Sequence, residues 1–133
     1  MKSDEQLLTE LAQVTDGLLF MSESDYPFEP VRWAERTELT PDVLRRLTGR
    51  DESAPIETQS VDDLFRAAAA EADWKSEQQL ATARRYQALV GWLQDNLMDV
   101  RVYRIGRVQI DVYIVGRSAD GNWIGLQTRV IET

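Results

Sequence analysis

The stretch Val100–Ile131, VRVYRIGRVQIDVYIVGRSADGNWIGLQTRVI, decides the class of fold. β-Branched residues recur through it and alternate with polar ones, which is typical of strands with one buried face. The pattern breaks at Gly106-Arg107 and at Ala119-Asp120-Gly121, and Asp-Gly favours a tight hairpin turn. We therefore predict an antiparallel meander of three strands, Val100–Ile105, Val108–Val115 and Asn122–Ile131. In the middle strand the alternation assigns one face to Val108, Ile110, Val112 and Ile114 and the other to Gln109, Asp111 and Tyr113.

Helical patterns fill most of the chain before the meander. Serine or threonine residues that can cap a first turn, followed by apolar residues at helical spacing, predict a helix at four places. These are Asp4–Val14, a short helix from Pro41 to Gly49, a helix after Ser60, and a long helix from about Ser76 to Leu97. Asp73 looks like a further helix start, and short strands are expected at Pro30–Glu35 and Ile56–Gln59.

The order of these elements predicts the architecture. Helices that precede a run of antiparallel strands indicate an α+β fold, here an α/β/α sandwich with a central, mainly antiparallel sheet. The chain has 133 residues and shows no internal repeat or interdomain linker, so we expect a single domain over residues 1–133.

Composition excludes several classes of function. The formal net charge of −8 opposes direct binding to nucleic acid and to anionic membranes, because both attract positive charge. Histidine and cysteine are both absent, which rules out a Ser-His-Asp or Cys-His catalytic arrangement and disfavours a zinc site. No stretch resembles a signal peptide or a membrane span. We expect a cytoplasmic acidic protein that has no cofactor and binds a partner rather than catalysing a reaction.

The stretch Asp16–Phe28 combines an apolar anchor with an acidic loop. The residues Leu18–Met21 are large and apolar and are expected in a core. Ser22-Glu23-Ser24-Asp25 follows, and then Tyr26-Pro27, where proline prevents a helix. Two interpretations stay open at this point. The serines are turn or cap residues and Glu23 is a solvated charge, or the loop holds the Glu23 carboxylate rigidly for a cationic partner.

Two further positions carry the same ambiguity. Trp74 falls at a junction between predicted helices, where it is either a core residue or an exposed anchor of the kind common at protein interfaces. Thr133 directly follows the last predicted strand, so the sheet can hold it in place, although a frayed end is the usual outcome.

A magnesium-dependent enzyme acting on a phosphorylated small molecule is the alternative from another class. Its candidate ligands are Glu23, Asp25, Asp62, Asp63 and Asp111, whose spacing matches no metal-binding motif. Asp62 and Asp63 already have a structural explanation, because acidic residues in a first helical turn stabilise the helix dipole.

Several segments resemble the nuclease A inhibitor family. The block Thr15–Glu29, TDGLLFMSESDYPFE, carries most of the resemblance. The strand segments VYRIG at 102–106 and DVY at 111–113, and the closing TRVIET at 128–133, also match. The similarity covers essentially the whole chain and is weakest over Arg32–Glu57.

The resemblance implies an inhibitor of a sugar-non-specific endonuclease whose ββα-metal active site contains magnesium, with a one-to-one complex expected. It implies that Glu23 and Thr133 enter the nuclease cleft as a phosphate mimic, with Thr133 near the nuclease's magnesium, and that Trp74 packs alongside. Ser22, Ser24 and Asp73 are expected to contact the partner as neighbours of these residues. Ala72 stands where the family has a glutamine contact. A domain of this fold without a nuclease partner is a further alternative.

Overall fold

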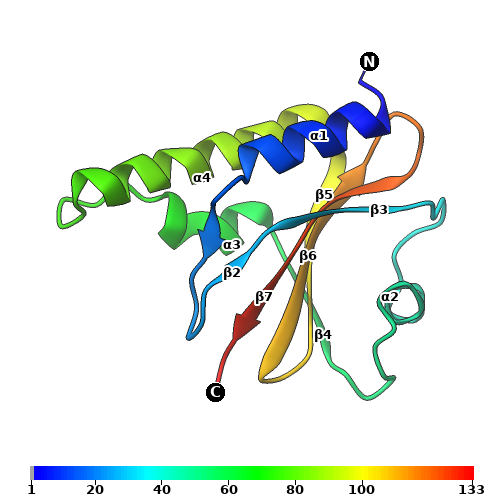
Figure 1. Ribbon diagram of the computed structural model, residues 1–133. Coiled ribbons are helices and arrows are strands. Elements are labelled where there is room, and N and C mark those ends of the chain that lie inside the picture. The colour runs from blue at the N-terminus through cyan, green and yellow to red at the C-terminus, as the bar shows by residue number, and fades with distance from the viewer. Residues whose placement is uncertain (1) are drawn as a thin grey trace.

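The mixed α+β class predicted from the sequence is confirmed by a computed structural model that describes residues 2–133 (Figure 1). The elements are α1 (Asp4–Val14), β1 (Leu19–Phe20), β2 (Tyr26–Pro27), β3 (Glu29–Trp33), α2 (Pro41–Thr48), β4 (Ile56–Gln59), α3 (Val61–Ala69), α4 (Glu77–Asn96), β5 (Met98–Ile105), β6 (Gln109–Arg117) and β7 (Trp123–Ile131). Across this part of the chain, β1 and β2 form a small sheet, and five strands form an antiparallel sheet in the order β3-β7-β6-β5-β4.

The predicted caps explain where the helices begin. The side chains of four residues accept a hydrogen bond from a first-turn amide: Ser3, Thr40, Ser60 and Ser76. The prediction of a helix start at Asp73 is wrong, because Asp73 lies in a turn and α4 begins after Ser76. Ser76 forms a reciprocal capping box with Gln79, which satisfies two amides at once. Helix α2 ends at Gly49, whose φ of 71° is left-handed.

The two faces of the large sheet bury separate apolar clusters. Ile110, Val112 and Ile114 of β6 face α1, α3 and α4 and belong to the larger cluster. Tyr113 and other residues of the opposite face pack against α2 and its flanking loops. Figure 1 shows α2 apart from the other three helices. The alternation predicted for β6 therefore holds within the strand, but Val108 precedes the strand and is about half exposed.

Helix α4 buries one stripe against the sheet. Ala83, Tyr86, Leu89 and Leu93 are buried, whereas Gln87 is exposed. Leu89 lies three residues after Tyr86 and so stays on the same inner face of the helix, whereas Gln87 directly follows Tyr86 and is turned away from that face. Among the described residues, no helix has the length and hydropathy required to cross a lipid bilayer.

A buried aromatic cluster fixes the β1–β2 ribbon to the rest of the protein. Phe20 of β1 lies 5.6 Å from Phe65 of α3 and 5.8 Å from Phe28, measured between ring centroids. The Thr128 hydroxyl of β7 donates a hydrogen bond to the Pro27 carbonyl at 2.9 Å. The aromatic cluster and β7 therefore both fix the ribbon, and the loop between β1 and β2 begins and ends at restrained residues.

Candidate partner-binding site

Glu23 and Thr133 contact each other directly. The Thr133 amide donates to Glu23 Oε2 at 2.5 Å, and the Thr133 hydroxyl donates to Glu23 Oε1 at 2.6 Å. The two residues are 110 positions apart in the sequence, and both are exposed. The structure thus brings the acidic loop and the end of β7 to one point on the surface, where Figure 1 shows the C-terminus beside the β1–β2 loop.

Ser22 joins the loop to β7. Its Oγ accepts a hydrogen bond from the Ile131 amide at 3.1 Å and donates one to the Ser24 carbonyl at 2.7 Å. The Ser24 amide also donates to Ser22 Oγ, at 3.4 Å. The Glu23 amide donates to the Ile131 carbonyl at 3.4 Å. We call Ser22, Glu23, Ser24, Ile131 and Thr133 the terminal clasp. All hydrogen bonds of the Ser22 hydroxyl in the clasp are made with backbone groups of this chain.

The segment leading into Thr133 is held on its other side as well. The Glu132 amide donates to the Val108 carbonyl at 3.0 Å. Arg104 of β5, whose side chain is mostly buried, forms an ion pair of 2.6 Å with the Glu132 carboxylate. The backbone of Glu132 is therefore anchored to the residue before β6, and its side chain is anchored to β5. The expectation that the sheet holds the last residues is met at Glu132, whereas Thr133 is held by Glu23 of the β1–β2 loop.

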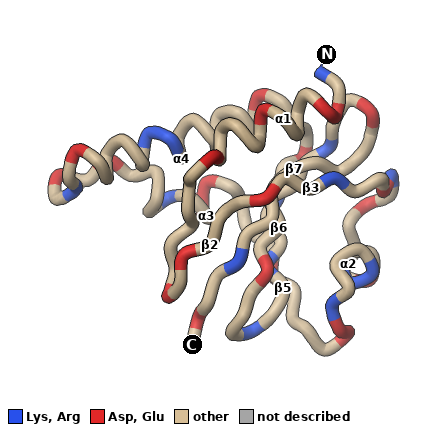
Figure 2. The backbone as a smooth tube through the Cα atoms, viewed as in Figure 1, with Lys and Arg blue, Asp and Glu red and all other residues tan. Residues whose placement is uncertain are grey.

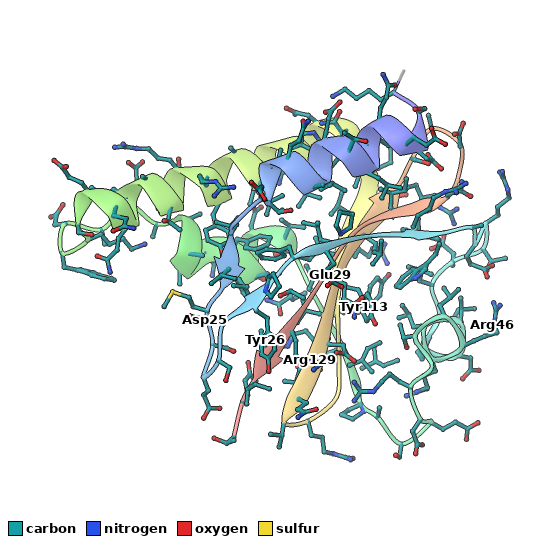
Figure 3. All side chains as sticks on the ribbon, viewed as in Figure 1. Asp25, Tyr26, Glu29, Arg46, Tyr113 and Arg129 are labelled. Carbon is teal, nitrogen blue, oxygen red and sulfur yellow. The ribbon has the colours of Figure 1, made fainter. Side chains whose placement is uncertain are left out.

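The terminal clasp is negatively charged at neutral pH. The hydroxyl and then the amide of Thr133 stabilise the ionised Glu23 carboxylate and lower the pKa of Glu23, while partial desolvation opposes this only weakly. Figure 2 shows acidic positions along the β1–β2 loop and at the end of β7. Asp25 is exposed on the same loop, beside Tyr26 in Figure 3. The clasp therefore presents an ionised carboxylate with fixed geometry.

Trp74 is an exposed residue and not part of the core. It lies with Asp73 in the connection between α3 and α4, and its side chain is 76 % exposed. The Lys75 ammonium lies 5.6 Å from the centre of the Trp74 ring and donates to the Ala67 and Ala70 carbonyls at the end of α3. Trp74 is therefore presented by an anchored turn.

The predicted site residues fall into two groups. Ser22, Glu23, Ser24 and Thr133 meet in the terminal clasp, whereas Asp73 and Trp74 lie on the α3–α4 connection. Across residues 2–133, no hydrogen bond or salt bridge links Asp73 or Trp74 to the clasp. Ala72 is partly buried in the same connection, and its carbonyl accepts a hydrogen bond from the Lys75 amide at 3.0 Å.

The carboxylates proposed as magnesium ligands do not form a common site. Asp111 pairs with Arg50 at 2.5 Å and with Arg129 at 3.3 Å, and Asp63 pairs with Arg66 at 2.5 Å. The Arg129 guanidinium also lies 5.7 Å from the Tyr26 ring, and both are labelled in Figure 3. Within the described part of the chain, no three acidic side chains are grouped so that they could hold a metal ion.

A comparison with models of protein families matches residues 5–133 to the nuclease A inhibitor-like proteins. The chain belongs to this family. A comparison with curated protein sequences gave no significant match. For a nuclease A inhibitor-like protein, the family indicates an inhibitor rather than an enzyme, and a nuclease as the partner.

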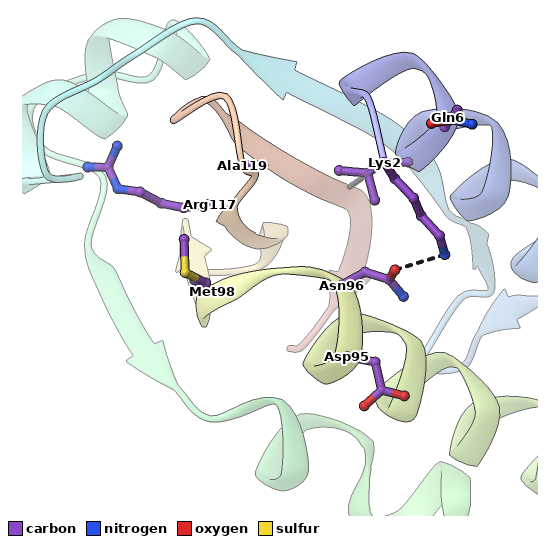
Figure 4. Close-up of a pocket in the computed structure, with 8 residues that line it drawn as sticks. Lys2, Gln6, Asp95, Asn96, Met98, Arg117 and Ala119 are labelled. Carbon is purple, nitrogen blue, oxygen red and sulfur yellow. Dashed lines mark hydrogen bonds between the residues drawn. The ribbon is translucent and has the colours of Figure 1, made fainter.

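One pocket of this nuclease A inhibitor-like protein lies away from the clasp. It is an open pocket of about 570 Å³ between the start of α1, the end of α4 and the β6–β7 connection (Figure 4). Lys2, Asp95 and Arg117 line it together with Met98, and Lys2 donates to Asn96 at 2.9 Å. Two cations and one acid do not make a catalytic set.

The structure corrects the sequence interpretation of Leu18–Met21 and adds residues that it missed. Leu18 and Phe20 are buried as expected, but Leu19 and Met21 are exposed. Side chains alternate between two faces along an extended chain, so a strand over these residues would have predicted that Leu18 and Phe20 face one way and Leu19 and Met21 the other. The backbone of Ile131 and the side chain of Arg104 also support the clasp, and no local signal in the sequence connects either of them with Glu23.

Proposed function

We propose that the protein inhibits a sugar-non-specific ββα-metal endonuclease by inserting the terminal clasp into the magnesium-containing cleft of the nuclease. Glu23 and Thr133 act as a phosphate mimic, and one inhibitor binds one nuclease. The observation that supports this best is the pair of hydrogen bonds between Thr133 and the Glu23 carboxylate. Together with the family membership, this contact supports the proposal that inhibition depends on the clasp.

The chemistry of the clasp suits a phosphate-binding cleft. Such clefts hold phosphate with arginine side chains and a hard cation, and carboxylate oxygens satisfy both. Thr133 contributes its hydroxyl, and in a chain that ends at Thr133 its terminal carboxylate adds two oxygens that can approach the nuclease's magnesium. Because the loop and β7 are already joined, little conformational entropy is lost when the clasp is bound.

Trp74 supplies a second contact outside the cleft. Large aromatic residues that are exposed in the free protein are frequent hot spots in complexes, and truncation of such a residue costs about 2 kcal/mol or more. For Trp74→Ala this corresponds to binding that is weaker by roughly 30-fold. Asp73 adjoins Trp74 and adds negative charge to the same connection.

Net charge contributes to the rate of encounter. The formal charge of −8 attracts a nuclease cleft that is basic, so the association rate should be high at low salt and fall as salt is added. This effect acts before contact and is separate from the short-range role of the clasp.

The test is inhibition of a ββα-metal nuclease by the parent protein and by Glu23→Ala, with Glu52→Ala as the control. Glu52 is an exposed glutamate in the loop between α2 and β4, so its loss changes net charge equally. We expect Glu23→Ala to inhibit at least about tenfold more weakly than both other proteins. Equal inhibition by all three proteins would refute the role of the clasp, and absence of inhibition by the parent would refute the function.

A further inference from the structure

Two large apolar side chains are exposed immediately before Glu23. Met21 is 77 % exposed and Leu19 is 46 % exposed. Phe20, which separates them, is buried in the aromatic cluster. Exposure alternates along Leu19, Phe20 and Met21 as it does along an extended chain, so Leu19 and Met21 share the outer side of the ribbon. We call these two residues the apolar pair.

The apolar pair cannot turn inward at low cost. The Leu19 carbonyl accepts a hydrogen bond from the Tyr86 hydroxyl at 2.5 Å, and Leu19 is paired with Pro27 across the ribbon. On the other side of Met21, Ser22 is fixed to the Ile131 amide at 3.1 Å. The backbone is thus restrained on both sides of Met21. Burial of Met21 would require loss of the contacts made by Phe20 or by Ser22.

We propose that the apolar pair is a contact surface for the nuclease, seated on an apolar rim beside the cationic cleft that receives Glu23. This inference rests on the proposed function and adds residues to the same interface. Met21 is separated from Glu23 by a single residue and both are exposed, so the two side chains are presented close together in the chain. Methionine suits this role because its flexible thioether adapts to the surface that it meets.

Charge favours a nuclease over a second copy of the chain as the occupant. Glu23 and Asp25 lie on the same loop as Met21, next to β1, and the whole chain carries a net charge of −8. Pairing of two such loops would bring like charges together, which is unfavourable. A basic cleft with an apolar rim complements both the charge of the loop and its exposed hydrocarbon.

Substitution of the apolar pair should change the rate of dissociation and not the rate of association. Long-range charge governs association, whereas short-range apolar contacts govern dissociation. Met21→Ser should therefore raise the dissociation rate about tenfold and leave the association rate almost unchanged, since one buried side chain is removed from the interface. The effect should be the same at low and at high salt, unlike that of a charge substitution.

The experiment measures binding to an inactive variant of a ββα-metal nuclease with magnesium present, for the parent, Met21→Ser, Leu19→Ser/Met21→Ser and Met98→Ser. Met98 is the matched control, because it is an exposed methionine (61 %) that lines the pocket at the start of α1. We expect weaker binding for the two variants of the apolar pair, parental binding for Met98→Ser, and unchanged melting temperature for Met21→Ser.

Each other outcome overturns the inference in an identifiable way. If the parent binds and Met21→Ser binds equally well, the apolar pair lies outside the interface while the proposed function stands. If the parent does not bind the nuclease at all, the proposed function fails and the inference fails with it. If gel filtration shows a dimer of the parent that Met21→Ser dissociates, the apolar pair serves self-association.

Discussion

Removal of the Ser22 hydroxyl should loosen the terminal clasp without removing any group that the proposal places against the nuclease's metal. In Ser22→Ala the Ile131 amide loses its acceptor at 3.1 Å and the Ser24 amide loses its acceptor at 3.4 Å. The Ser24 carbonyl loses the hydroxyl donor at 2.7 Å but keeps the Ser22 amide at 3.3 Å. One net hydrogen bond contributes about 0.5–1.5 kcal/mol, and a partly buried amide left without a partner costs about as much again. We expect the free energy of unfolding to fall by about 1–2 kcal/mol.

The effect should be concentrated at the chain end. Ile131 and Thr133 are attached to the loop through Ser22 and Glu23, so local opening of this segment becomes easier by up to about tenfold for 1.4 kcal/mol. Hydrogen exchange of the Ile131 and Thr133 amides should accelerate by that factor, while amides in the middle of β6 change only with global stability. Inhibition should weaken because the clasp is less well ordered before binding.

Hydrogen exchange followed by NMR, together with an inhibition titration, tests this reasoning. Ser24→Ala is the control, because the Ser24 side chain makes no hydrogen bond within the described residues and only the backbone of Ser24 takes part in the clasp. The reasoning is refuted if Ser22→Ala leaves exchange at Ile131 and Thr133 unchanged, or if Ser24→Ala accelerates it equally.

Three further predictions concern the support of the clasp, its charge and the sheet beneath it. Arg104→Ala removes the 2.6 Å ion pair with Glu132. The free energy of binding to the nuclease should therefore fall by more than the free energy of unfolding does. Equal inhibition by variant and parent would contradict this. The pKa of Glu23 is lowered below its ordinary 4.5, so the contact with Thr133 stabilises the folded state above that pH and is lost as pH falls through the lowered pKa. NMR titration of the Glu23 carboxyl should report a midpoint below 4.5. A midpoint above 4.5 would contradict the contact. Gly125→Ala should unfold or severely destabilise the protein, by about 3 kcal/mol or more, because a Cβ there would overlap the Ile114 carbonyl of the neighbouring strand; a melting temperature equal to that of the parent would contradict the close approach.

Local chemistry made the elements predictable. Serine and threonine caps act on amides only a few residues away, so Ser3 and Thr40 marked their helices correctly. The prediction failed at Asp73, where an acidic residue competed with a stronger signal, the Ser76–Gln79 capping box. Alternation within the meander likewise indicated the buried face of β6, because side-chain direction in a strand follows from the backbone.

The candidate site depends on contacts that no local rule predicts. Glu23 and Thr133 are separated by 110 positions, and only the placement of the β1–β2 ribbon against β7 joins them. The role proposed for them comes from the family resemblance. The exposure of Met21 was missed because four apolar residues in a row were taken as one buried unit, whereas the ribbon turns every second one outward.

The central claim is that Glu23 and Thr133 enter the nuclease cleft. A crystal structure of the inhibitor bound to a ββα-metal nuclease with magnesium tests it most directly. We predict that the Glu23 carboxylate contacts a cationic side chain of the nuclease and that Thr133 lies at the metal. A complex in which these two residues face solvent would contradict the account.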